Sequence, residues 1–330
     1  AELDVFCSFS WVAGRNRYVR PVIRDKGSIR IRGGRHPVIE AMDRSELFVE
    51  NDTMLDQRDH RVLVITGPNM AGKSTYMRQS ALIVLMAQIG SFVPASSAEI
   101  GIVDRIFTRV GASDDLSSGQ STFMLEMQEV AHILKNATPK SLLILDEIGR
   151  GTSTFDGLSI AWAVIEHIAD TRKLGAKTLF ATHYHELTEL EGKLAGVKNY
   201  CIAVKEKGED IVFLRKIVRG GADKSYGVQV ARLAGVPDSV IRRAKELAEE
   251  LSKADITAAV RDLTEIRKKA SGTIRYDTVD LHQMSLFDTT DDTRIINEIR
   301  DLEISSMTPL EALNFLHHLQ SEVRNRWQAE

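Results

Sequence analysis

One short stretch constrains the fold of this chain more than any other feature: GPNMAGKST, residues 67–75. It matches the pattern G-x-x-x-x-G-K-[ST] and directly follows the apolar run RVLVIT. In this pattern the glycines allow backbone amides to curl around phosphate groups, and the lysine reaches the outer phosphates. The following helix directs its positive end towards them. The sequence therefore predicts a phosphate-binding loop between a buried strand and a helix that begins near Lys73.

We expect this whole loop to take part in binding a nucleotide. The Lys73 ammonium would neutralise phosphate charge, and the Ser74 hydroxyl would bind Mg²⁺. A chance glycine-rich turn is the alternative, but such a turn needs neither the strand before it nor the helix after it. The expected phosphate-binding residues are Gly67, Pro68, Asn69, Met70, Ala71, Gly72, Lys73, Ser74 and Thr75.

A regular alternation surrounds the loop between residues 61 and 218. The runs RVLVIT, RIFTRV, SLLILDEI and KTLFATH are short and largely apolar, and longer segments of helical character separate them. Such runs are typical of strands that are covered on both faces. The pattern predicts an α/β domain with a parallel or mixed sheet flanked by helices. Before it, residues 1–20 are predicted to form a helix that Pro21 would end, and residues 24–39 to form strands and turns.

Two carboxylates stand at the end of the run SLLIL. Asp146 and Glu147 follow four apolar residues, where an unpartnered charge is costly. We expect Asp146 to hold Mg²⁺, directly or through water, and Glu147 to orient and deprotonate an attacking water. Capping by both acids is the structural alternative. Because adjacent side chains on a strand point to opposite faces, the two roles require a twist or the end of the strand here.

His183 stands at the end of another apolar run, TLFATH. An imidazole at that position can donate a hydrogen bond to the terminal phosphate and respond to its loss. A lone histidine at a strand end is more often structural, so the sensing role depends on the neighbouring motifs.

Composition excludes several other classes of protein. The 330 residues suffice for two or more domains, and a net charge of −3 gives no overall basic field, so a nucleic-acid contact would need a local patch. The two cysteines, Cys7 and Cys201, lack metal-ligand spacing, which indicates a reducing compartment. The longest apolar run, residues 81–87, is too short for a bilayer, so we expect a cytoplasmic protein. The chain begins without methionine, and we expect it to be a fragment.

The C-terminal third changes character twice. Residues 228–270 are predicted to be helical with one break at AGVPDS. Five aspartates and no lysine or arginine follow between Asp277 and Asp292, which indicates a solvated linker. The segment MTPLEALNFLHHLQ then starts a new helix, with Thr308 as the N-cap and Glu311 completing the capping box.

Four of these stretches together resemble the ATPase domain of the MutS family of DNA mismatch-repair proteins, in its bacterial form. They are TGPNMAGKSTYMRQ, DRIFTRVGASDDLSSGQSTFMLEM, LLILDEIGRGTSTFDG and FATHYHELTEL. The later KSYGVQVARLAGVPDSVIRRA is similar to the helical segment that follows this domain in the family. The resemblance implies an α/β P-loop NTPase of the ABC type, with a mixed sheet flanked by helices, which hydrolyses ATP to ADP with Mg²⁺.

The resemblance also implies a division of the chain into five parts. Residues 1–30 would be the end of a central helical lever region, and residues 31–227 would form the ABC-type ATPase domain. Residues 228–270 would be a helix-turn-helix dimerisation segment and residues 271–292 a flexible acidic linker. Residues 293–330 would form a small C-terminal helical oligomerisation module.

The stretch DLSSGQSTFMLEM, residues 115–127, raises the possibility of a second phosphate contact. On composition alone, its hydroxyls and glycine are most simply a helix N-cap. In the family the composite site spans a dimer, so the resemblance implies that Gly119, Ser121 and Thr122 face the γ-phosphate bound by the partner's Lys73. An amide-rich helix start would complete the anion cage only when two chains close.

Further site residues follow from the resemblance one position at a time. Asn69 would contact the nucleotide or the attacking water, and GRGTSTFDG, residues 149–157, would couple the two sites of the dimer. Ala71 replaces the glycine that is usual in bacterial members, and its methyl group fits where φ is negative.

An adenine pocket is implied on the far side of the loop. Phe48 would stack on adenine, with Val49 beside it. Arg215 falls by count on the other face of the base, where the family often has an aromatic residue or histidine, and a guanidinium can also stack.

The resemblance implies several partners for the intact protein. The spacing within residues 228–247 is also that of a DNA-reading helix-turn-helix, but the family uses this element to dimerise. QMSLF, Gln283 to Phe287, resembles the peptide by which bacterial replication proteins dock on the sliding clamp. The last helix would permit a tetramer. The intact protein would act at the nucleoid with a MutL-type partner and mismatched DNA, whereas we expect the mismatch-reading domain to be absent here.

Two alternatives stay open on the sequence alone. The first is another cassette-type ATPase head, as in transporters or chromosome-organising proteins, although those carry an LSGG-like signature and SSGQSTF is not one. The second is a scaffold that recruits partners and has a vestigial ATPase. The intact Lys73, Asp146 and Glu147 argue against that second reading.

Overall fold

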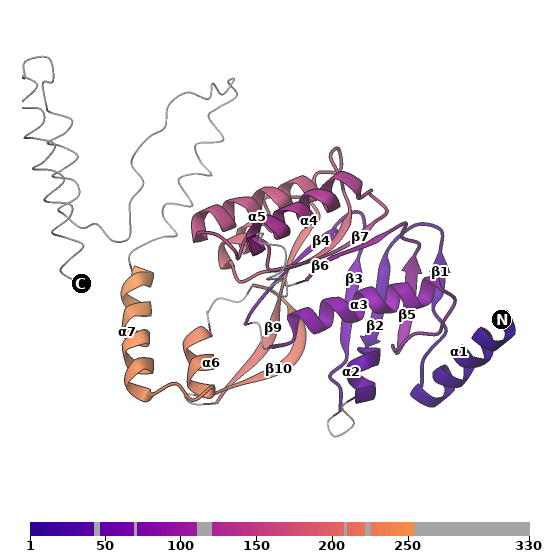
Figure 1. The fold of residues 1–330 in the computed structure, drawn as a ribbon, viewed down its shortest axis with the longest axis horizontal. Coiled ribbons are helices and arrows are strands. Elements are labelled where there is room, and N and C mark those ends of the chain that lie inside the picture. Colours follow the sequence, from indigo (N-terminus) through magenta and orange to yellow (C-terminus); the bar gives the residue numbers. More distant parts are fainter. Residues whose placement is uncertain (43–46, 69–70, 111–120, 208–209, 222–225, 254–330) are drawn as a thin grey trace, which may run out of the picture. The chain divides into compact units, whose positions relative to one another are not determined.

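A six-stranded sheet carries most of the positions named above. The structure, a computed structural model, describes residues 1–42, 47–68, 71–110, 121–207, 210–221 and 226–253 (Figure 1). The strands lie in the order β10-β9-β4-β8-β7-β6, and all neighbours are parallel except the β9–β10 hairpin. Their bounds are Val62–Thr66 (β4), Ile106–Arg109 (β6), Leu142–Asp146 (β7), Lys177–Ala181 (β8), Val197–Lys207 (β9) and Asp210–Arg219 (β10).

The two faces of this sheet are buried in two separate cores. On β4, Leu63 points into one core and Val64 into the other, as the two-residue period of a strand requires. The first core includes side chains of α3 (Lys73–Gln88), and the second includes those of α4 (Thr122–Asn136) and α5 (Thr154–Ala169). Every residue of β4, β7 and β8 is buried, which explains why the sequence shows largely apolar runs at these strands.

A smaller sheet of four strands covers the first core, in the order β1-β5-β2-β3. Its strands are Val22–Arg24 (β1), Ile29–Gly34 (β2), Asn51–Leu55 (β3) and Ser97–Gly101 (β5). Ile29 and Ile31 of β2 and Ile100 of β5 are buried in this core. The expected boundary after residue 30 therefore falls inside β2.

The expected strands are present. The apolar runs RVLVIT, RIFTRV, SLLILDEI and KTLFATH correspond to β4, β6, β7 and β8, so these four predictions are confirmed. The break at AGVPDS separates α6 (Gly227–Leu233) from α7 (Asp238–Lys253), and these two helices contact each other.

Two predictions in the first forty residues need correction. The N-terminal helix is α1 (Glu2–Asn16), but it ends before Pro21, because Arg17 adopts the left-handed region with φ 53° and its N–H donates to the Ala13 carbonyl. The prediction of strands and turns was wrong at its end, where α2 (Pro37–Met42) begins. A proline is favoured in the first turn of a helix because its missing N–H is not needed there.

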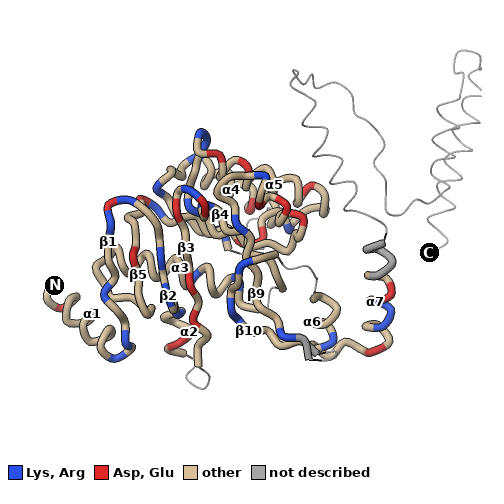
Figure 2. Tube along the Cα trace, turned by 180° about the vertical axis from the view of Figure 1, so that it is seen from behind, with Lys and Arg blue, Asp and Glu red and all other residues tan. Residues whose placement is uncertain are grey.

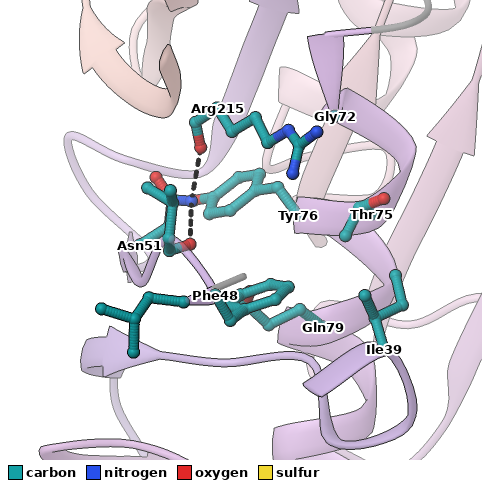
Figure 3. A pocket seen from close by; sticks show the side chains of 10 residues that line it. Ile39, Phe48, Asn51, Gly72, Thr75, Tyr76, Gln79 and Arg215 are labelled. Atoms are coloured by element: carbon teal, nitrogen blue, oxygen red, sulfur yellow. Dashed lines mark hydrogen bonds between the residues drawn. The ribbon is translucent and has the colours of Figure 1, made fainter. Parts of the chain in front are cut away.

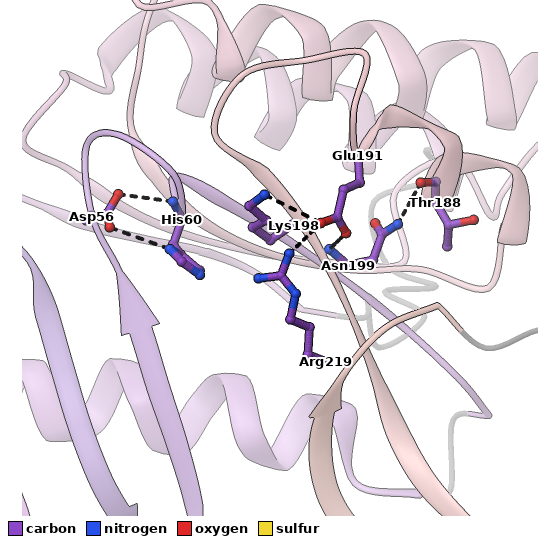
Figure 4. Close-up of polar contacts among 7 residues, drawn as sticks. All are labelled: Asp56, His60, Thr188, Glu191, Lys198, Asn199 and Arg219. Carbon is purple, nitrogen blue, oxygen red and sulfur yellow. Dashed lines mark hydrogen bonds and ion pairs between the residues drawn. The ribbon is translucent and has the colours of Figure 1, made fainter.

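Charged side chains attach the segment after β8 to the β9–β10 hairpin (Figure 4). Glu191 follows the 3₁₀ helix η2 (His185–Leu190) and accepts the Asn199 backbone N–H at 2.7 Å. Its other carboxylate oxygen lies 2.7 Å from Nη2 of Arg219. These contacts set the path of the chain that follows His183.

The chain beyond residue 253 lies outside the described residues, which applies to the expected linker, to Gln283–Phe287 and to residues 293–330. Within the described part, no helix is both long and apolar enough to cross a membrane. Acidic and basic residues are interspersed along the described trace, in keeping with the net charge of −3 (Figure 2).

The double burial of β4 leads to a prediction about stability. Replacing the fully buried Ile65 by alanine should lower the free energy of unfolding by about 2–5 kcal/mol, because it leaves a cavity between α3 and the sheet. Val22 on the edge strand β1 is 48% exposed, and Val22→Ala should change that free energy by only about 0.5 kcal/mol. Urea denaturation measures the free energy of unfolding of both variants. Equal losses of this free energy would contradict the two-core arrangement.

Candidate active site

The phosphate loop joins β4 to α3 at the edge where the parallel strands end. β4 ends at Thr66 and α3 begins at Lys73, as the motif predicts. Gly67 and Gly72 have φ values of 127° and 106°, in the left-handed region where a side chain would be strained. The glycines of the motif are therefore required by the backbone path of this loop.

The other residues of the loop fit this path where the structure describes them. Ala71 donates its N–H to the Pro68 carbonyl at 3.2 Å, and its methyl group is fully buried. Among the described residues, Ala71 is not one of those with positive φ, so the condition stated for its side chain is met. Asn69 and Met70 lie outside the described residues.

Lys73 is buried at the foot of the loop. Its side chain is 1% exposed, and the ammonium donates a hydrogen bond to the Gly67 carbonyl. Burial lowers the pKa of this ammonium, while the carboxylates of Glu147 and Asp146 act in the opposite direction. The loop thus holds a desolvated positive charge where phosphate oxygens would bind.

Ser74 and Asp146 come together across the sheet. The Ser74 hydroxyl donates to Oδ2 of Asp146 at 2.5 Å, although β8 lies between β4 and β7. Oδ1 of Asp146 is buried and has no hydrogen-bond partner among the described residues. Burial raises the pKa of this carboxyl, and the Ser74 hydrogen bond opposes that shift.

This pair has the chemistry that a Mg²⁺ site needs. A hydroxyl and a carboxylate with a spare buried oxygen are hard oxygen ligands. Among the described residues there is no cluster of three or more His, Cys, Asp or Glu that could hold a metal. A cation here would therefore take its remaining ligands from water and phosphate, which is how Mg²⁺ is usually bound beside nucleotides.

Glu147 adopts a backbone conformation that is rare for its residue type. β7 ends at Asp146, and Glu147 has a φ of 56°, in the left-handed region. This turn resolves the problem that adjacent strand residues point to opposite faces. Its carboxylate accepts a hydrogen bond from Arg150 at 2.6 Å and influences the pKa of Lys73. Strained residues of this kind cluster at functional sites.

His183 follows β8, the strand between β4 and β7. Partial burial lowers the pKa of its imidazole, so the ring is predominantly neutral at pH 7. The ring centroid lies 4.1 Å from that of Tyr184, whose hydroxyl donates to the Gly149 carbonyl at 3.0 Å. The histidine is thus connected through its neighbour to the loop after Glu147.

A pocket of about 240 Å³ adjoins the start of α3 (Figure 3). The expected adenine-contacting residues Phe48, Val49 and Arg215 all line it, and Gly72 and Thr75 form its boundary with the phosphate loop. The three come from segments more than 160 residues apart in the sequence. The described residues that line it are Ile39, Leu47, Phe48, Val49, Asn51, Gly72, Thr75, Tyr76, Gln79 and Arg215.

Asn51 connects the two halves of this pocket. The register of β9 and β10 shifts between Phe213 and Ile217, and Arg215 in that bulge has a φ of 54°. The Asn51 side chain donates to the Arg215 carbonyl at 3.0 Å (Figure 3). Its amide oxygen accepts the Ile217 N–H at 2.7 Å. The bulge is thereby held against β3, and it presents Arg215 to the pocket.

Sequence reasoning missed five described residues that line this pocket: Ile39, Leu47, Asn51, Tyr76 and Gln79. Asn51 and Ile39 carry no motif, and only the tertiary structure reveals them. Gln79 could have been found from helical spacing, because it lies one turn beyond Thr75 on α3. Its side chain is fully buried, and neither amide atom has a hydrogen-bond partner among the described residues.

The second stretch of hydroxyls lies at the start of α4. Ser121 is the N-cap residue and Thr122 the first helical residue, and both are exposed. Within the described part of the chain, neither makes a hydrogen bond to the phosphate loop of its own chain. Gly119 lies outside the described residues.

Comparison with known proteins accords with this geometry. The family profile described as MutS domain V matches residues 63–252, which include the phosphate loop, both acids and α4. The chain belongs to the MutS family. Its two sheets flanked by helices are the α/β architecture of that domain.

Curated members of the MutS family are similar over almost the whole chain. The DNA mismatch repair protein MutS of Acetivibrio thermocellus is 62% identical over 324 residues, which cover 98% of this chain and 36% of that protein. MutS of Ruminiclostridium cellulolyticum is 62% identical over 330 residues, or 99% of this chain and 36% of that protein. MutS of Caldicellulosiruptor bescii is 59% identical over 325 residues, with shares of 98% and 36%. The chain thus spans about a third of the length of these relatives.

The left-handed backbone at Glu147 can be tested without any activity assay. Glu147→Gly and Glu147→Ala both remove the carboxylate, but only glycine adopts this φ without strain. The glycine variant should be more stable by about 1 kcal/mol in urea denaturation. At the exposed Ser159 within α5 the order should reverse, with alanine more stable than glycine by about 1 kcal/mol. The same order at both positions would rule out the conformation described for Glu147.

Proposed function

We propose that this chain is the Mg²⁺-dependent ATPase portion of a DNA mismatch-repair protein of the MutS family, converting ATP to ADP and phosphate. The observation that carries the proposal is the contact of Ser74 with Asp146, next to the buried Lys73 and the left-handed Glu147. Families that bind nucleotides without hydrolysing them have no need of an acid held under strain beside the metal ligand. Membership of the MutS family supports the same conclusion.

Each residue has a distinct role in the proposed reaction. Lys73 neutralises charge on the outer phosphates, and Ser74 and Asp146 would hold Mg²⁺. An ion held there would supply further positive charge against the phosphates. Glu147 accepts the proton of a water that attacks the γ-phosphorus in line, as the bond to the β-phosphate oxygen breaks. The neutral His183 donates a hydrogen bond to the γ-phosphate and loses it when phosphate leaves.

The pocket beside α3 is suited to the base. Adenine would lie between the Phe48 ring and the Arg215 guanidinium, with Val49 at its edge, and the volume of about 240 Å³ accommodates a purine. The ribose and phosphates would then extend past Thr75 to the phosphate loop. Asn69 would contact the phosphates or the attacking water.

The site would be completed by a second copy of the chain. Ser121 and Thr122 are exposed at the start of an amphipathic helix, and among the described residues neither makes a hydrogen bond to its own phosphate loop. Together with Gly119 they would contact the γ-phosphate held by the partner's Lys73. ATP would then hold the dimer closed, and hydrolysis would loosen it.

The remaining assignments concern the intact protein. The lever would end with residues 1–30, and the ATPase domain would be residues 31–227. The helix-turn-helix dimerisation segment would follow as residues 228–270, the linker as 271–292 and the oligomerisation module as 293–330. The ATPase cycle would couple mismatch recognition to formation of a sliding clamp on DNA. The sliding clamp of replication, through Gln283–Phe287, and a MutL-type protein would be partners. Such a protein would act in the cytoplasm at the nucleoid, and its last helix would permit tetramers.

Mixing two inactive variants tests the proposed dimer. Lys73→Ala and Ser121→Ala should each lower ATP turnover strongly in the presence of Mg²⁺. In an equal mixture, half of the dimers contain one undamaged site, so turnover should return to roughly a quarter of the wild-type value. A coupled phosphate-release assay across a range of protein concentrations provides the measurement.

Each other outcome of this experiment has a clear meaning. Full activity of Ser121→Ala alone would mean that the site is complete within one chain, as expected for a different kind of ATPase head. A wild-type chain that is inactive at every concentration would favour the scaffold that only recruits partners.

Truncating the aromatic wall of the base pocket should separate binding from chemistry. Phe48→Ala should raise KM for ATP about tenfold, because stacking contributes about 1–1.5 kcal/mol, with little change in kcat. Phe92 is 40% exposed and is not part of this pocket, so Phe92→Ala should leave both constants unchanged. Steady-state kinetics would contradict the assignment if KM were unaffected by the Phe48 change.

A further inference from the structure

Two side chains hold the loop after Glu147 at one residue, Gly149. The Gly149 N–H donates to Oε1 of Glu126 at 2.5 Å. Its carbonyl accepts the hydroxyl of Tyr184 at 3.0 Å. Gly149 lies two residues beyond Glu147 and has a φ of 87°, so its orientation depends on these two contacts and not on a regular element. The direction in which the loop leaves Glu147 is therefore set by two side chains distant in sequence.

Glu126 belongs to α4, the helix that begins with Ser121 and Thr122. Its side chain is 6% exposed, and its second oxygen lies 3.6 Å from Nη2 of Arg109 at the end of β6. A buried carboxylate is costly unless paired, and this one is nearer to the Gly149 amide than to the guanidinium. A hydrogen bond from an amide to an ionised carboxylate is about twice as strong as a neutral one.

Close packing around the loop makes this connection stiff. A methyl group added at Gly151 would lie 2.9 Å from the Phe123 side chain of α4. One added at Gly157 would collide with the Gly149 carbonyl and with the Tyr184 hydroxyl. Since the loop touches α4 at two points and has no free space on the side of α5, a displacement of α4 must displace the loop.

A purely structural role for Glu126 is the obvious alternative. Arg109, however, also lies 2.8 Å from Glu129, which is on the same helix and 46% exposed. Charge balance for Arg109 is therefore available without Glu126. Glu126 accepts a hydrogen bond from the Gly149 amide, and Glu129 does not. The two acids therefore differ in their contact with the loop, although both lie beside Arg109.

We propose that Glu126 is a positioning residue, which ties the loop carrying Glu147 to helix α4 through the Gly149 amide. The proposal rests on the proposed ATPase function of the site. Its consequence is a connection inside each chain: the helix start that would contact the partner's nucleotide and the carboxylate that acts on the chain's own nucleotide move together. Tyr184 extends the same connection to His183, because its ring contacts the histidine and its hydroxyl holds Gly149.

The test compares three variants of the full chain. Glu126→Ala should lower kcat about tenfold or more, because the Glu147 carboxylate loses its position, while the affinity for a fluorescent ATP analogue stays within about twofold. Glu126→Gln keeps an acceptor oxygen for the Gly149 amide and should recover most of the lost kcat. Glu129→Gln also removes a charge beside Arg109 but does not touch the loop, and it should behave as wild type.

Three outcomes would overturn the inference. One is an unchanged kcat in Glu126→Ala, another is an equal loss in Glu126→Gln and Glu129→Gln, and the third is a parallel loss of nucleotide affinity. Thermal melting of each variant, with kcat expressed per folded molecule, removes the effect of lower stability. If the wild-type chain hydrolyses ATP and Glu126→Ala does so equally well, only this inference is contradicted. If the wild-type chain does not hydrolyse ATP, the proposed function and the inference are contradicted together.

A mixed dimer identifies the chain in which Glu126 acts. One chain of the dimer carries Lys73→Ala, so only the nucleotide site with the other chain's Lys73 stays intact. Glu126→Ala placed on that other chain should lower the turnover of the intact site about tenfold. Glu126→Ala on the chain that carries Lys73→Ala should have a much smaller effect. The reverse order would show that Glu126 acts through the partner's site, and it would overturn the assignment.

Discussion

The hydrogen bond between Ser74 and Asp146 is the contact on which the rest of the site depends. It joins the first turn of α3, the helix that follows β4, to the last residue of β7. These two strands are not adjacent, because β8 lies between them in the sheet. The contact forms because parallel strands end at the same edge of a sheet, where a helix start and a strand end can meet. Lys73 is the residue before Ser74 and Glu147 is the residue after Asp146. One short contact therefore sets the relative position of the cation and both acids.

The strained backbone at this edge of the sheet is stabilised by buried side chains elsewhere in the fold. Glu147 and Arg215 are held with positive φ, which costs of order 1–3 kcal/mol for each residue. Glu147 follows β7, which is buried along its whole length, and Arg215 lies in the bulge of the edge strand β10. Buried polar side chains hold both strained segments: Asn51 holds the bulge of β10, and Glu126 together with Tyr184 holds the loop after β7. Two of the three described non-glycine residues with positive φ thus lie at the candidate site, and the third, Arg17, ends α1.

Much of the fold was predictable, because its strands are buried on both faces and therefore appear as apolar runs. Such runs identified β4, β6, β7 and β8, and the phosphate motif predicted a helix start near Lys73, where α3 begins. The four-stranded sheet was not predictable, since β1 pairs with β5 at the register of Val22 with Glu99 and no local pattern encodes that pairing. The end of α1 was also missed, because a left-handed Arg17 ends it before the proline is reached.

Sequence by itself determined the chemical groups of the site: the glycines that permit the loop, Lys73, Ser74, the adjacent acids and His183. These groups are readable because each requires a particular residue type within a few positions of a strand end. The tertiary structure alone decided which of them meet, that Glu147 turns out of the strand, and that Phe48 and Arg215 share one pocket. It also revealed the contacts of Asn51, which belongs to no motif, and of Glu126, which lies inside a quoted stretch that gave it no role. Their roles arise from contacts between segments far apart in the chain, and a contact between distant segments leaves no periodic trace in one sequence.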